Sequence, residues 1–360
     1  MRAGLLARGD ERISMLYEQL KNLTFGQKIG AEALVVAFVV FLLSVLATRL
    51  ILPILRAKKL NQPINMYVSE HAGKAGTPTM GGICFIIASL IAILVWLVLE
   101  LGGYIGEGES RLLLPFILTV CLSVANALIG FVDDYKKLVK KENEGLTEAQ
   151  KFSLQVIVTL AYLAMMGMTN SLPTALELPF SDRALELGFF AYPLYLIIIV
   201  GFVNSTNITD GLDGLASSIG VSVSVALISF AVIVGSRNTA IASATLLGAL
   251  LGFLVFNHYP AKIFMGDTGS LYIGGMIVGC AVAEGELISV MIMAFVFVFE
   301  MLSSLMQRVY FKLTHGKRLF KKAPVHHHYQ MLGWSETKIV GVFFIVSLVL
   351  SVIGVLGAII

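Results

Sequence analysis

Five aspartates in three short segments have the residue type and spacing for metal or phosphate chemistry. Asp133 and Asp134 are adjacent in FVDDYKK, Asp210 and Asp213 lie three apart in NSTNITDGLDGLA, and Asp267 stands between two glycines in HYPAKIFMGDTGS. Adjacent helical side chains point about 100° apart, so Asp133 and Asp134 cannot both bind one ion without help from another segment. The acids do not stand at every second position, which excludes a calcium-binding loop.

Lysines and a helix start accompany these acids and favour a Mg²⁺ diphosphate as the ligand. Magnesium takes one or two protein carboxylates and completes its shell with phosphate oxygens and water. Ser270 begins an expected helix, whose free N–H groups suit an anion. The candidate substrate-binding residues are Lys74, Thr77, Lys137, Lys151, Asn207, Asp210, Asp213, Asn257 and Ser270. The alternatives are that the acids are solvated helix caps and that the lysines only set membrane orientation.

Three consecutive histidines, His326, His327 and His328, form a further polar cluster. In an extended chain the first and third would point together and the second opposite. No cysteine or acid stands at zinc-ligand spacing, so we favour phosphate or nucleotide contact over transition-metal binding. Glu300 lies inside an apolar run, where a carboxylate needs a protein, water or cation partner. A structural partner, such as a serine or a backbone N–H, and a substrate role are equally open for it.

The composition predicts an all-α integral membrane protein. Of the 360 residues, 57% are hydrophobic and only 14% are charged, whereas soluble domains carry about 25% charged residues. The net charge of +3 is too small to indicate a nucleic-acid partner. There is no Walker phosphate loop, G-x-G-x-x-G, H-E-x-x-H or G-x-S-x-G motif, so nucleotide-driven motors and common hydrolases are unsupported.

Long apolar runs predict about ten transmembrane helices in one polytopic domain, residues 29–360, after an amphipathic or disordered lead-in, residues 1–28. We place the spans near 30–55, 79–100, 112–132, 152–170, 189–205, 214–234, 239–256, 269–284, 287–311 and 337–358.

Basic residues are distributed unevenly between the connections of these spans. The odd-numbered connections hold seventeen Lys and Arg residues, whereas the even-numbered ones hold only Arg111, Arg183 and Arg237. The positive-inside rule then puts the odd connections in the cytoplasm and both termini outside. Five basic residues before the first span argue weakly against this orientation. The aspartates and the histidines all fall at the cytoplasmic helix ends, which predicts one shared site there.

Five ordered motifs resemble those of the bacterial phospho-N-acetylmuramoyl-pentapeptide transferase family. They are KAGTPTMGG (74–82), DDYKK (133–137), NSTNITDGLDGLA (204–216), FNHYPAKIFMGDTGS (256–270) and KRLFKKAPVHHHYQMLGW (317–334). The resemblance covers nearly the whole chain from the first span onward. The TPTMGG segment and the triple histidine favour this family over transferases that use UDP-N-acetylglucosamine. Gln330 stands where the resemblance leads us to expect an acid.

The resemblance implies transfer of phospho-MurNAc-pentapeptide from its UDP carrier to undecaprenyl phosphate in the bacterial cell membrane, with Mg²⁺ as cofactor. It implies that Asp267 is the magnesium ligand and that Asp133 and Asp134 are catalytic acids near the lipid phosphate. By the same resemblance, Asn207, Asp210 and Asp213 contribute to the nucleotide region, the three histidines are an essential cluster, and the protein is a homodimer.

Three alternatives remain open at this stage. Within the enzyme class, a sister transferase would use another UDP-sugar, and a covalent phospho-aspartate route would compete with direct attack by the lipid phosphate. In another class, an ion-coupled transporter would place its acids near the bilayer midplane. Here all the acids except Glu300 stand at one edge of the predicted spans, which favours the transferase.

Overall fold

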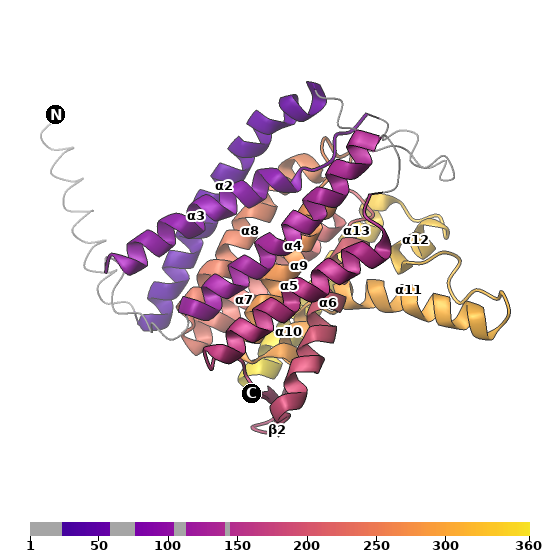
Figure 1. The fold of residues 1–360 in the computed structure, drawn as a ribbon. Helices are drawn as coiled ribbons and strands as arrows, with labels where there is room; N and C mark the ends of the chain where they lie inside the picture. The colour runs from indigo at the N-terminus through magenta and orange to yellow at the C-terminus, as the bar shows by residue number, and fades with distance from the viewer. Residues whose placement is uncertain (1–23, 58–75, 104–112, 141–144) are drawn as a thin grey trace, which may run out of the picture.

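The computed structural model describes residues 24–57, 76–103, 113–140 and 145–360 as a bundle of long helices (Figure 1). The helices are α2 (Phe25–Ala57), α3 (Gly82–Leu101), α4 (Leu113–Lys140), α5 (Glu148–Met168), α6 (Ala191–Thr209), α7 (Leu215–Val234), α8 (Arg237–Asn257), α9 (Gly266–Glu284), α10 (Leu287–Met293), α11 (Phe295–Leu313), α12 (Val325–Gln330) and α13 (Glu336–Ile359). Most of the predicted lead-in lies outside the described residues, and α2 begins at Phe25.

Eight of these helices are long and apolar enough to cross a membrane, and a bent pair would bring the number to nine within the described residues. The all-α membrane class is therefore confirmed, but the structure divides the predicted span 287–311. It contains α10 and α11, which meet at Ala294 with a bend of 83°. Beyond this bend α11 extends away from the rest of the bundle (Figure 1).

Helix α9 lies at the centre of the bundle and packs against α4, α6 and α3. Its residues 268–282 are buried all round, which explains how a glycine-rich, weakly apolar segment is stable there. Two glycines permit its close approach to neighbours. A Cβ at Gly130 of α4 would collide with the backbone of Asp267, and one at Gly82 of α3 would collide with Gly269. These contacts fix the position of the α9 N-terminus along the axes of α3 and α4.

A short antiparallel hairpin between α5 and α6 was not predicted from the sequence. Strands β1 (Ala175–Glu177) and β2 (Ala184–Glu186) pair with Leu176 opposite Leu185. A 3-10 turn, η3 (Gly188–Phe190), leads from the hairpin into α6. The strands have only three residues each, which is too short for a clear alternation of apolar and polar positions.

Candidate active site

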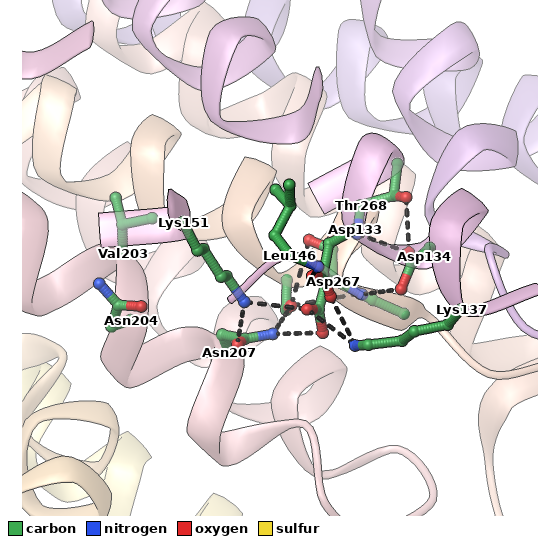
Figure 2. A network of polar contacts seen from close by, with 12 residues as sticks. Asp133, Asp134, Lys137, Leu146, Lys151, Val203, Asn204, Asn207, Asp267 and Thr268 are labelled. Carbon is green, nitrogen blue, oxygen red and sulfur yellow. Dashed lines mark hydrogen bonds and ion pairs between the residues drawn. The ribbon is translucent and has the colours of Figure 1, made fainter. Parts of the chain in front are cut away.

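Three aspartates from two helices meet where the C-terminal part of α4 faces the N-terminus of α9 (Figure 2). Asp133, Asp134 and Asp267 each offer a carboxylate oxygen, and these oxygens lie within 4.8 Å of one another. Asp133 and Asp134 are buried, and Asp267 is partly exposed. The start of α9 therefore supplies the third carboxylate that the adjacent pair on α4 needs to form a metal site.

Two lysine ammonium groups surround Asp267. Lys151 Nζ of α5 lies 2.9 Å from Asp267 Oδ2, and Lys137 Nζ of α4 lies 3.3 Å from the same oxygen. Lys137 also pairs with Asp133 Oδ2 at 2.5 Å, one helical turn away. Lys151 stands in the first turn of α5, which Thr147 and Gln150 cap reciprocally. Three carboxylates thus lie beside only two ammonium groups. The excess of acidic groups favours the binding of a further cation.

Asp134 caps the N-terminus of α9 from a neighbouring helix. Its Oδ1 accepts a hydrogen bond from the Asp267 N–H at 3.1 Å, and its Oδ2 accepts from the Thr268 N–H at 3.0 Å and hydroxyl at 2.7 Å. A carboxylate at a helix N-terminus satisfies free N–H groups and complements the helix dipole. Sequence reasoning missed Thr268, because its partner Asp134 comes from another helix and leaves no local signal.

The Asn207 amide fixes the second oxygen of Asp267. Asn207 Nδ2 of α6 donates to Asp267 Oδ1 at 2.8 Å and to Ser270 Oγ at 2.9 Å. Lys151 in turn donates to Asn207 Oδ1 at 2.8 Å. One turn earlier on α6, Asn204 bonds Gln155 of α5 at 2.7 Å. The structure therefore brings together the predicted residues of α4, α5, α6 and α9.

The TPTMGG segment runs alongside the chain that leads into Asp267. The Phe264 N–H donates to the Pro78 carbonyl at 2.8 Å, and the Gly81 N–H donates to the Phe264 carbonyl at 2.8 Å. Thr77 is half-buried at the start of this pairing. The motif therefore braces the loop before Asp267 through its backbone. Lys74 lies outside the described residues.

Asp210 lies in the turn between α6 and α7, beside the aspartate cluster. Burial, together with the negative charges of Asp267, Asp134 and Asp213, raises the pKa of Asp210 to about 8, against a backbone hydrogen bond from Gly266. Such a shift marks a group that faces other acids in a poorly solvated site.

Asp213 and Asn257, both predicted to bind substrate, make bonds within the protein. Asp213 Oδ2 accepts from the Ala261 N–H at 2.9 Å, and the Asp213 N–H donates to Glu336 of α13 at 2.6 Å. Asn257 accepts from the Ser217 hydroxyl and donates to the Ile263 carbonyl, each at 3.0 Å. These contacts hold the loop between α8 and α9 in place, and the structure does not bring either side chain into the three-aspartate cluster.

The three histidines lie on the short helix α12 and not on an extended strand, so the expected pairing of the first and third is wrong. His326 is buried, and its Nδ1 lies 2.8 Å from Glu300 Oε2 of α11. His328 Nδ1 accepts from the Lys321 N–H at 3.1 Å on another side. His327 Nδ1 lies 2.6 Å from Gln330 Oε1, so an amide fills the position where an acid was expected.

The His326–Glu300 pair answers the question left open for Glu300. Glu300 is fully buried and its partner is an imidazole, which sequence reasoning did not foresee. His326 Nε2 has no hydrogen-bond partner among the described residues. A Cβ added at Gly211, next to Asp210, would lie 2.5 Å from this nitrogen, so the imidazole reaches the turn that carries Asp210.

Comparison with known proteins decides the family. A phospho-N-acetylmuramoyl-pentapeptide-transferase from Bacillus subtilis (strain 168) is 39% identical over 319 residues, which is 88% of this chain and 94% of that protein. The chain belongs to the phospho-N-acetylmuramoyl-pentapeptide-transferase family. The Staphylococcus carnosus (strain TM300) member is 37% identical over 323 residues, covering 89% of this chain and 97% of its own.

Two family models match as well. Residues 116–285 match the Glycosyl transferase family 4 model, and residues 74–86 match signature 1 of the phospho-N-acetylmuramoyl-pentapeptide transferases. The first match contains the whole aspartate cluster, and the second contains the TPTMGG segment that braces Asp267. The chain is therefore a membrane-embedded transferase of this family, as its motifs predicted.

Proposed function

We propose that this transferase moves phospho-MurNAc-pentapeptide from UDP-MurNAc-pentapeptide to undecaprenyl phosphate, forming lipid I and releasing UMP. One observation carries the proposal: three carboxylates and two lysines converge at the ends of membrane helices in a chain of this family. A water-soluble diphosphate donor needs a polar site, and a polyprenyl acceptor needs that site at the membrane edge.

The donor set of the aspartate cluster fits Mg²⁺, which prefers oxygen ligands and few protein carboxylates. Asp267 and Asp133 would hold the ion, because Asp134 already uses both oxygens to cap α9. Bound Mg²⁺ would neutralise the charge that develops on the diphosphate oxygens. The ammonium groups of Lys137 and Lys151 would then turn from Asp267 toward phosphate oxygens and hold the donor in place.

We propose direct attack by a lipid phosphate oxygen on the sugar-linked phosphorus of the donor. A new P–O bond forms to the lipid phosphate, the bond to the UMP phosphate oxygen breaks, and UMP leaves. A phosphate monoester has a second pKa of about 6, so the nucleophile is already largely dianionic and Asp133 need not be a strong base. The task of the side chains is therefore positioning and charge neutralisation. Since one diphosphate replaces another, the reaction should be readily reversible.

The histidines contribute a second polar region, on α12. His326 would offer Nε2 to a donor phosphate or to the uridine, with Glu300 holding its other nitrogen. Asp210 and Asn207 would line the space between this region and the metal. We propose that this face is cytoplasmic, in agreement with the basic residues of the odd-numbered connections, that both termini lie outside, and that the transferase acts as a homodimer.

Release of UMP by the purified protein tests this proposal. The protein is incubated with undecaprenyl phosphate and Mg²⁺, and UDP-MurNAc-pentapeptide is compared with UDP-N-acetylglucosamine. We expect UMP from the muramyl donor only. Release from the other donor would assign the chain to a sister specificity, and release from neither would overturn the proposed reaction.

The direct route has its own test. Donor labelled in the sugar-linked phosphate is incubated with the protein without lipid. We expect no label on the protein and no exchange of free UMP into the donor. A phosphorylated aspartate would overturn direct attack in favour of the covalent route.

A further inference from the structure

A small polar cavity lies at the opposite end of α4 and α9 from the three aspartates. Because the two helices run antiparallel, the end of α9 at Glu284 lies beside the first turns of α4 at Thr119. Helix α8 begins at the same level and adds Asn238 and Thr239 to the lining. The cavity has room for one water molecule or one small ion.

Glu284 brings a carboxyl group into the lining of this cavity. Its carboxylate accepts hydrogen bonds from the Ser236 and Thr239 hydroxyls, and donors of this kind stabilise the ionised form. Among the described residues, no Lys, Arg or His forms an ion pair with it. The neighbouring cation, Arg237, binds Glu32 at 2.5 Å. Glu284 is half-buried, and an ionised carboxylate in such a place is stabilised by a counter-charge.

A buried amide side chain also points to a missing partner in the cavity. Asn238 is 7% exposed and Thr119 is 1% exposed, and both line the cavity. Asn238 Oδ1 has no hydrogen-bond partner within the described structure, whereas the Thr119 hydroxyl is within hydrogen-bonding reach of the Tyr162 hydroxyl of α5. Buried polar atoms nearly always have a partner, so a group placed in the cavity would satisfy Asn238 Oδ1.

The chemistry of the lining identifies the class of ligand. We propose that Glu284, Asn238, Thr119 and Thr239 bind one small monovalent cation, for which Na⁺ is the probe. Carboxylate, amide carbonyl and hydroxyl oxygens are the ligands that hard cations take. A single carboxylate balances a single positive charge, and a bound cation would stabilise the ionised form of Glu284, which a bound water would do less well.

Such an ion would join three helices at the end of the bundle that carries no catalytic acid. Helices α4 and α9 hold Asp133, Asp134 and Asp267 at their other ends, so the cation would hold in register the two helices that position these acids. Its occupancy therefore affects stability first, by linkage of binding to folding.

Thermal unfolding of the full-length detergent-solubilised protein tests the site. NaCl is titrated against choline chloride at constant ionic strength, and ²²Na⁺ binding is measured in parallel. We expect a saturable rise in Tm and one bound Na⁺ per chain. Glu284→Gln should lose both, whereas Glu186→Gln, at an exposed acid of the β2 strand, should behave as the wild type.

Thr119→Val provides a second variant that keeps the charge and nearly the same shape. We expect it to weaken Na⁺ binding several-fold, so the site remains testable if Glu284→Gln does not fold. A wild-type Tm that does not depend on Na⁺, or an equal Na⁺ response in Glu284→Gln, would overturn the proposal and leave a water molecule in the cavity.

Discussion

Asp134 on α4 accepts two hydrogen bonds from Thr268 on α9, one from the backbone N–H at 3.0 Å and one from the hydroxyl at 2.7 Å. The bonds join two helices 134 positions apart in the chain at the turn that carries Asp267. Two neighbouring aspartates on α4 thus have different tasks: Asp134 orients the end of α9, and Asp133 faces Lys137 and Asp267.

Asp134→Asn should lower both stability and activity. Both Asp134 oxygens accept from N–H or O–H groups, so an amide nitrogen in place of either oxygen would face a donor. We expect a loss of about 1 kcal/mol or more in the free energy of unfolding, a typical cost of a lost helix cap. Thermal melts together with UMP release measure it. Asp133→Asn is the control, which should lose activity with a smaller change in Tm; equal changes would contradict the separate tasks.

Lys151→Gln should lower the turnover rate without weakening Mg²⁺ binding. The ammonium group lies 2.9 Å from Asp267 Oδ2 and competes there with a divalent cation. Its loss should leave the Mg²⁺ concentration for half-maximal rate unchanged or lower, and should reduce kcat about 100-fold, as for other groups that neutralise transition-state charge. Lys312→Gln, at an exposed lysine of α11, is the matched control. A raised Mg²⁺ requirement with normal kcat would show that Lys151 serves the metal and not the phosphates.

Glu300 and His326 should act as one unit. Glu300→Gln keeps a polar partner at His326 Nδ1 but removes the charge that orients the imidazole, so kcat should fall about tenfold or more. Kinetics of Glu300→Gln, His326→Ala and the double variant form a double-mutant cycle. We expect the double variant to be no slower than His326→Ala alone. Additive losses would mean that the two residues work independently.

The raised pKa of Asp210 predicts a pH-dependent stability. The folded state binds a proton at Asp210 up to about pH 8, whereas the unfolded carboxyl releases it near its usual value of 3.8. Stability therefore falls as pH rises between these values and levels off above the upper one. Melts without Mg²⁺ from about pH 6 to pH 9 should show a steeper decline in the wild type than in Asp210→Asn. Parallel curves would show that Asp210 stays charged.

The membrane fold was predictable from the sequence because a span needs about 20 apolar residues, and such runs are visible without a structure. The bend at Ala294 was not predictable, since Met293, Ala294 and Phe295 include neither proline nor glycine. The eight apolar helices and the bent pair account for nine of the ten predicted spans, and the tenth, 269–284, is the glycine-rich helix α9.

The three-aspartate cluster was predictable in its members but not in the contacts that each of them makes. The acids at the helix ends predicted the cluster. Lys137, Lys151 and Asn207 all contact Asp267, as expected from their motifs. The capping bonds of Asp134 and the burial of Asn257 depend on the packing of distant segments. The Glu300–His326 pair joins residues 26 positions apart on two helices, a contact that no local pattern encodes.

Formation of lipid-linked product is the direct test that this protein makes lipid I and needs Asp267 and Mg²⁺ to do so. Protein in lipid vesicles is given UDP-MurNAc-pentapeptide labelled in the sugar, with undecaprenyl phosphate and Mg²⁺, and the label extracted with the lipid is counted. We expect labelled lipid I from the wild type and from Asp182→Asn, an exposed acid near β2, and none from Asp267→Asn or without Mg²⁺. Undiminished product from Asp267→Asn, in a variant that melts like the wild type, would contradict this expectation.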